Sequence, residues 1–185
     1  MESLQGLLLV ASPALDDGYF ARTVSLLVRH GPDGAMGLVL NRPIELPMSQ
    51  AWEQISDTPC ADTGSLHVGG PVEGPLMVLH QDEGHSQIEV SEALHFCTEA
   101  HLIEKVVGGN PNPMLRCFAG YAGWTAGQLE EELAQGTWVL AKPTPQMLFG
   151  LDDEAQYEAA MRLADPVLGT LACHPHLVPQ DPGMN

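Results

Sequence analysis

The sequence predicts a mixed α/β domain of the α+β class whose sheet is largely antiparallel. Hydrophobic residues make up 44% of the 185 residues, which is enough material for a core. Short β-rich runs outnumber helical segments, and neighbouring runs are often joined by tight turns. The regular strand–helix–strand alternation of a doubly wound dinucleotide fold is missing, so that fold is disfavoured.

The N-terminal quarter predicts three strands. The apolar run Gly6–Ser12 is typical of a buried strand. Thr23–His30 and Ala35–Asn41 are β-rich and flank Gly31-Pro32-Asp33-Gly34, whose proline and glycines favour a tight reversal. We therefore expect a hairpin here, and Pro43 should end its second strand because proline donates no ladder hydrogen bond.

The remaining elements follow from the same signals. Further strands are predicted at Leu66–Gly70, Leu76–His80, Leu94–Cys97, Met114–Ala119 and Thr137–Ala141, the first two as a pair around Gly69-Gly70-Pro71. Helices are predicted at Ser49–Ile55, after an N-cap at Thr98, between Thr125 and Gly136, and at Asp153–Leu163. Thr125 with Gln128 three residues later fits a capping box.

We expect one domain over residues 1–172 and a mobile, proline-rich tail over residues 173–185. The four cysteines (Cys60, Cys97, Cys117 and Cys173) lie far apart without a CxxC pair, which is typical of reduced thiols. No apolar run is long enough to cross a bilayer, and the N-terminus lacks the positive charge of a signal peptide. A cytoplasmic protein without a membrane association is expected.

The chain is strongly acidic. The chain has seven Lys and Arg residues and twenty-four Asp and Glu residues, which gives a formal net charge of -17. Residues 1–42 are nearly neutral, with three cations and four acids, so the remaining residues carry most of the charge. A field of this sign repels a polyanion, and direct DNA binding is disfavoured. Solubility or adaptation to salt also explains such acidity.

Several distinctive strings follow one another over roughly residues 4–150: Arg29-His30, Gly34 to Pro43 (GAMGLVLNRP), Val68 to Val72 (VGGPV), Val78-Leu79-His80, Gly120 to Trp124 (GYAGW), Gly127 to Glu130 with Glu132, and Met147-Leu148-Phe149. Taken in this order, they resemble the AlgH/YqgE family. The resemblance implies a compact mixed α/β domain with an irregular, barrel-like sheet and a bacterial cytoplasmic setting. It implies no known reaction. Some members carry the label of transcriptional regulator.

Two histidines and an asparagine come at predicted strand ends. His30, Asn41 and His80 could line one pocket, where a neutral imidazole serves as a general base. Alternatively, each side chain bonds a neighbouring turn, as asparagine often does. Arg42 could hold a carboxylate or phosphate, or could be structural. No GxSxG or similar motif supplies a nucleophile.

The glycine-rich strings also have two readings. Gly69-Gly70-Pro71 and Gly120–Gly127 could offer backbone N–H groups to an anion, but glycines in turns explain these strings without any ligand, and we favour that interpretation. Tyr121 and Trp124 stand out in a chain with 5% aromatic residues, either as interface anchors or as lids over the core. Gln128 and Glu130 belong to the same strip.

We therefore expect no cofactor and no specific metal. Cys173-His174-Pro175-His176 supplies only one half of a zinc site. The absence of a complete catalytic set favours a non-enzymatic regulatory or adaptor protein that binds another protein through the Tyr121–Glu130 strip and the near-neutral N-terminal quarter. The alternative is a small-molecule binder or hydrolase with a His30/Asn41/His80 pocket. The sequence leaves the oligomeric state open.

Overall fold

The computed structural model describes residues 3–15, 18–60, 64–109, 114–150, 153–165 and 168. Within these residues the strands are β1 Leu8–Ala11, β2 Val24–Gly31, β3 Gly34–Val39, β4 Pro43–Pro47, β5 Ser65–Val68, β6 Val72–His80, β7 Ile88–Ser91, β8 Leu94–Cys97, β9 Leu115–Thr125 and β10 Trp138–Ala141. The helices are α1 Met48–Trp52, α2 Ala100–Val107, α3 Gln128–Ala134, α4 Pro145–Phe149 and α5 Asp153–Arg162, with a 3-10 turn η1 at Glu83–His85. The predicted tail lies outside the described residues.

The strands form one sheet in the order β10-β1-β2-β3-β9-β6-β8-β7, while β5 lies beside β9 and carries β4 on its other edge. Every described pairing is antiparallel except that of β5 with β9. The prediction of a mixed, largely antiparallel fold is therefore confirmed, although the sheet does not close into a barrel. No helix among the described residues has the length and apolarity required to span a membrane.

The predicted hairpin is present. β2 and β3 pair up to Gly31 opposite Gly34, so Pro32 and Asp33 form the turn, as their residue types favour. The first predicted strand is β1, which pairs on one side with β2 and on the other with β10. This half of the sheet places His30 at the end of β2, next to the hairpin tip.

Strand β9 is longer than the sequence predicted. The prediction ended it at Ala119, but the strand continues through the glycine-rich string to Thr125. Its first half pairs with β5 and β6, and its second half pairs with β3. Gly120 and Gly123, which suggested a turn, are instead strand residues, and the missing side chain of Gly120 lets the backbone at Gly70 and Val72 approach. β9 thus joins both halves of the sheet.

Three other features of the sheet differ from expectation. β5 and β6 do not pair with each other; both lie against β9, β5 in parallel and β6 antiparallel. The second hairpin strand ends at Val39, earlier than predicted, and Pro43 instead begins β4, an edge strand where its missing N–H costs little. β7 was not predicted, because Ile88–Ser91 has a single buried residue, Val90.

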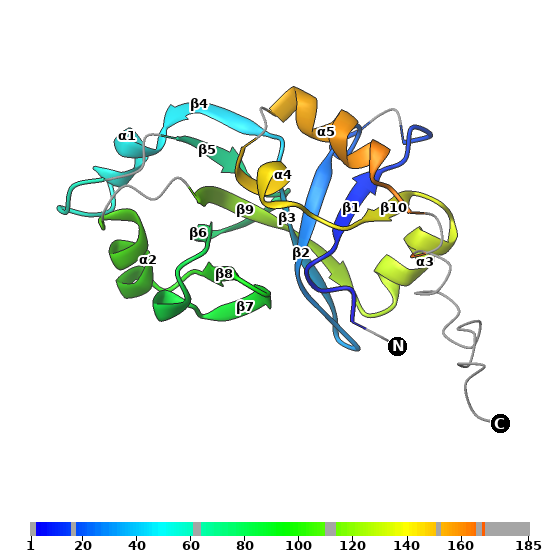
Figure 1. Ribbon diagram of the computed structural model, residues 1–185, viewed down its shortest axis with the longest axis horizontal. Helices are drawn as coiled ribbons and strands as arrows, with labels where there is room; N and C mark the ends of the chain where they lie inside the picture. The colour runs from blue at the N-terminus through cyan, green and yellow to red at the C-terminus, as the bar shows by residue number, and fades with distance from the viewer. Residues whose placement is uncertain are drawn as a thin grey trace.

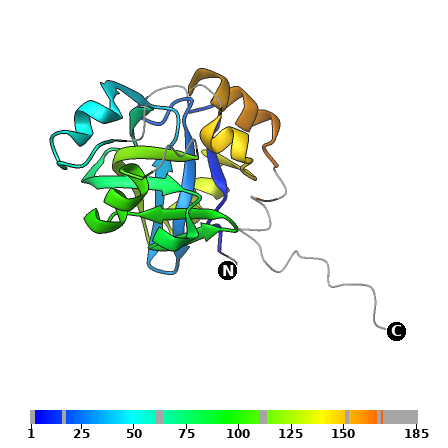
Figure 2. The same cartoon turned by 60° about the vertical axis from the view of Figure 1, so that its left-hand side comes forward.

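The core has two parts. The larger one packs β1, β2 and β3 against α3, α4 and α5, and includes Trp124, Trp138 and Tyr157. The smaller one packs α1 and α2 on the other half of the sheet, around Trp52 and Cys97. Figure 1 shows α1 and α2 at one end of the molecule and α3 toward the other, and in Figure 2 α1 and α2 lie on the side away from α5.

Candidate functional site

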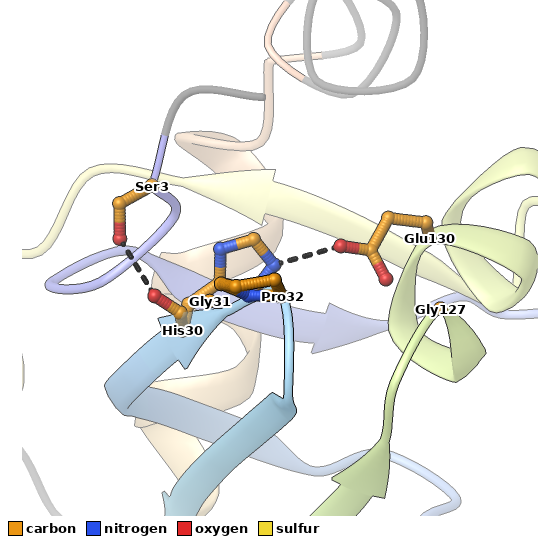
Figure 3. A pocket seen from close by; sticks show the side chains of 6 residues that line it. All are labelled: Ser3, His30, Gly31, Pro32, Gly127 and Glu130. Atoms are coloured by element: carbon orange, nitrogen blue, oxygen red, sulfur yellow. Dashed lines mark hydrogen bonds and ion pairs between the residues drawn. The ribbon is translucent and has the colours of Figure 1, made fainter.

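The surface is hollowed where the β2–β3 hairpin tip faces the start of α3 (Figure 3). The hollow has a volume of about 600 Å³. It is lined by Ser3, His30, Gly31, Pro32, Gly127 and Glu130, and we call it the His30 hollow. It therefore joins the near-neutral N-terminal quarter to the strip that ends at Glu130, the two segments that the sequence singled out for binding.

His30 and Glu130 are bonded to each other across this hollow. His30 Nε2 lies 3.0 Å from Glu130 Oε1, and the His30 side chain is only 4% exposed. The Leu4 N–H donates to His30 Nδ1 over 3.1 Å. Because Nδ1 is an acceptor, the ring proton must be on Nε2, from which it is donated to Glu130. The two residues were predicted separately, and the structure brings them together.

This arrangement differs from that of a catalytic histidine. An activating imidazole accepts a proton from a nucleophile on one nitrogen and is oriented by a carboxylate through the other. Here a backbone N–H occupies the position where a nucleophile would lie. The Ser3 hydroxyl donates to the His30 carbonyl oxygen over 3.2 Å and not to the ring (Figure 3). The geometry thus fixes the hairpin to its neighbours and shapes the hollow.

The start of α3 forms one wall of the hollow, and it is capped differently from a standard capping box. The helix begins after Gly127, which is in the left-handed conformation at φ 78° and provides no side-chain cap. The predicted N-cap at Thr125 is therefore wrong, since Thr125 still belongs to β9. Gln128 fulfils its half of the capping box, because its Oε1 accepts the Thr125 N–H over 3.0 Å.

Glu132 is a structural residue that the sequence reasoning missed. Its Oε2 accepts the indole N–H of Trp124 over 2.9 Å and that of Trp138 over 2.7 Å, and its Oε1 accepts from Gln128. Trp124 is 6% exposed and stacks near Phe20, so it belongs to the core and is not an exposed anchor. The signal for such a residue was the tryptophans themselves, because an indole N–H that becomes buried requires a hydrogen-bond acceptor.

Tyr121, the other aromatic residue of the strip, is half-buried on β9 opposite Val72. It does not line the His30 hollow.

Asn41 and Arg42 lie at the other end of β2 from His30. The Asn41 side chain accepts the Val24 N–H and donates to the Arg22 carbonyl, both over 2.9 Å. The Arg42 guanidinium donates to the Ala21 carbonyl over 2.6 Å and to the Asn41 carbonyl over 3.2 Å. Six residues of strand separate Val24 from His30, which is about 20 Å. These contacts match the structural reading.

His80 lies in a third environment. It is fully buried, its Nδ1 accepts the Asp82 N–H over 3.2 Å, and its ring centroid is 6.0 Å from that of His95. Its Nε2 has no hydrogen-bond partner among the described residues. Burial, followed by the nearby His95, lowers the pKa of His80 to about 4. The predicted pocket shared by His30, Asn41 and His80 is therefore not formed, because each side chain bonds a different part of the fold.

The Gly69-Gly70-Pro71 string serves backbone packing. The Gly69 carbonyl accepts the Val39 N–H, and its N–H donates to the Ala119 carbonyl over 2.9 Å. A Cβ on Gly69 would lie 2.2 Å from the Gly120 carbonyl oxygen, so only glycine fits. The Gly69 N–H is thus not available to an anion.

The structure describes three of the four cysteines but not the segment in which half of a zinc site was noted. Cys60, Cys97 and Cys117 form no disulfide, as predicted. Among the described residues, no group of His, Cys, Asp and Glu side chains has the geometry to hold a metal ion. The Cys173–His176 segment lies outside the described residues.

Comparison with known proteins places the chain in a family. Residues 8–168 match the AlgH-like family model. A UPF0301 protein from Chromobacterium violaceum is 38% identical over 90% of this chain and 94% of its own length. A UPF0301 protein from Pseudomonas putida is 38% identical over 82% of this chain and 84% of its own.

Two solved structures have a similar fold. The solution structure of AlgH from Pseudomonas aeruginosa has a TM-score of 0.73 at 34% identity and covers 87% of this chain and 88% of its own. Protein DIP2367 from Corynebacterium diphtheriae has a TM-score of 0.68 over 91% of this chain and 93% of its own, but at 23% identity it supports the fold alone. The ordered strings, the matched family model and these likenesses agree, and the chain belongs to the AlgH-like family.

Proposed function

We propose that this protein is a non-enzymatic regulatory or adaptor protein that binds another protein at the His30 hollow. The observation that carries the proposal is the meeting of the hairpin tip with the start of α3 around an open hollow. Exposed Pro32 on one wall and Glu130 on the other provide a fixed, concave surface of mixed character. Such preformed surfaces are typical of recognition sites, because little ordering is required on binding.

Binding is favoured over catalysis by the state of His30. Both ring nitrogens are engaged within the protein, one by a backbone N–H and the other by Glu130. A general base needs a nitrogen that can accept a proton from a reacting group. To act so, His30 would have to give up its bond to Leu4, which also fixes the N-terminal segment. The family label suggests a regulatory role, and we propose that the protein exerts it through a protein partner. Its net charge of -17 disfavours direct binding to DNA.

The setting that we propose is the bacterial cytoplasm. Its support is the absence of disulfides among Cys60, Cys97 and Cys117, and the bacterial origin of the relatives.

The test is affinity capture with quantitative mass spectrometry in the bacterium that makes the protein. Pro32→Arg fills the hollow from its exposed wall, and Pro43→Arg makes the same exchange at an exposed proline outside it. We expect a partner that is recovered with the wild type and with Pro43→Arg but lost with Pro32→Arg. Equal recovery with all three folded proteins would refute the proposal.

A second candidate is a small-molecule binder at the same hollow. Its volume of about 600 Å³ is within the range of ligand pockets, roughly 300–1,000 Å³. A metabolite that raises the melting temperature of the wild type but not of Pro32→Arg would favour this candidate over a protein partner.

A further inference from the structure

An apolar groove is lined by residues of α1, of the turn after it, of β6 and of α2. Figure 1 shows α1 and α2 at the end of the molecule away from α3, the helix that lines the His30 hollow. Its volume is about 210 Å³. The apolar lining comprises Trp52, Ile55, Pro75, Leu76, Ala100 and Ile103, and we call it the α1–α2 groove. A second hollow of about 420 Å³ adjoins it and shares Trp52 and Ser56.

Ile55 is the most exposed large hydrophobic side chain among the described residues, at 58%. Exposing such an apolar side chain to water is unfavourable, and a partner that covers it would remove this cost. The turn that carries Ile55 is held by polar bonds and not by Ile55 itself. The Trp52 indole N–H donates to the Thr58 carbonyl over 2.8 Å, and the Ser56 hydroxyl donates to Glu104 over 3.3 Å.

The charge around the groove has one sign. Glu104 lines the groove itself, and Glu53 and Asp57 line the adjoining hollow. Neither lining contains Lys or Arg; Lys105, the next residue on α2, lies outside both. Cations opposite these carboxylates would be attracted, whereas acidic partners would be repelled. A second copy of this chain is a poor occupant for the same reason, given its net charge of -17.

We infer that the α1–α2 groove docks a cationic amphipathic helix of another protein. The apolar face of that helix covers Ile55, Leu76 and Ala100, which line the groove and are not buried, and its Lys and Arg side chains face the acidic rim. This is the helix-in-groove mode, in which apolar anchors recur every three or four residues. The surface is separate from the His30 hollow, so this inference and the proposed function stand or fall independently. Together they would give an adaptor two docking surfaces.

The test uses a synthetic helix-forming peptide of leucine and lysine, about 14 residues or four turns long. Its two controls are the same composition in scrambled order and the same leucine pattern with glutamate for lysine. We expect the amphipathic cationic peptide to bind with a Kd on the order of 10 µM, and neither control to bind comparably. In ¹H–¹⁵N spectra the Trp52 indole N–H signal, assigned with Trp52→Phe, should shift, while those of the two other tryptophans should not.

Variants then locate the contact. Ile55→Ser should weaken binding at least about tenfold, because an apolar contact is lost. Leu163→Ser, which removes a side chain of 49% exposure on another part of the surface, should leave binding unchanged. Glu104→Gln should weaken binding less at high salt than at low salt. The inference is overturned if the scrambled peptide binds equally, if Leu163→Ser matches Ile55→Ser, if the Trp52 signal does not move, or if no peptide binds.

Discussion

His80 should make the folded protein less stable as the pH falls below about 6.5. Its pKa is lowered to about 4 in the folded state, first by burial and then by His95, against the opposing effect of Asp82. In the unfolded chain the pKa returns to about 6.5. The unfolded state therefore takes up the proton at higher pH than the folded state, and lowering the pH favours unfolding. This contribution to stability is complete above about pH 6.5 and is lost as the pH falls to about 4.

The size of the effect follows from the two pKa values. A difference of one pKa unit between the two states corresponds to about 1.4 kcal/mol. The shift from about 6.5 to about 4 therefore changes the free energy of unfolding by about 3 kcal/mol in total. At about pH 5 roughly 2 kcal/mol is already lost. Protonation would also place a second proton on Nδ1 and break its bond with the Asp82 N–H, which begins the turn at η1.

The measurement is urea unfolding followed by tryptophan fluorescence at about pH 7.5 and about pH 5. His80→Asn is the informative variant, because its side-chain oxygen can replace Nδ1 as the acceptor of the Asp82 N–H and does not titrate here. The variant starts from a lower stability owing to lost packing, but it should lose about 2 kcal/mol less than the wild type over this interval. His101→Asn, at an exposed histidine, should behave like the wild type. Equal losses in the wild type and His80→Asn would refute the reasoning.

Four other substitutions or treatments have defined outcomes. Glu132→Ala should lower the free energy of unfolding by about 3 kcal/mol in urea titrations, because both buried indole N–H groups lose a charged acceptor. Gly69→Ala should cost about 3 kcal/mol or prevent folding, whereas Gly31→Ala, whose added Cβ would meet no atom within 4 Å, should cost less than 1 kcal/mol. Asn41→Ala should lower stability by about 2 kcal/mol yet leave partner capture unchanged, as calorimetry and affinity capture would check. Cys97, whose pKa is raised to about 12 mainly by burial, should resist alkylation at about pH 8 until urea unfolds the chain.

Local patterns predicted local structure well. The β2–β3 hairpin needs only two β-rich runs and a turn between them, and both are readable from neighbouring residues. The pairing of β5 and β6 with β9 involves residues 35 to 51 positions apart, and no local signal specifies such a partner. The glycines of β9 misled the prediction because glycine usually ends an element, whereas at Gly120 the missing side chain admits another backbone.

The site was predicted only in part, for the same reason. His30 and Glu130 were both singled out, but they lie a hundred positions apart and nothing in the sequence pairs them. Glu132 was missed because an acid in the first turns of a helix is explained by the helix dipole alone. Only the fold shows that it accepts from both Trp124 and Trp138.

The strings that mark the family are largely accounted for by packing. Gly69 allows two backbones to touch, Trp124 is bonded inside the core, and Asn41 joins the segment after β3 to the start of β2. Substituting such residues would reduce folding and binding together, so a loss of partner capture in those variants would say nothing about a recognition surface. Pro32 and Ile55 are exposed, and the core does not depend on either. A binding defect in a fully folded Pro32→Arg or Ile55→Ser protein can therefore be assigned to the surface that carries the change.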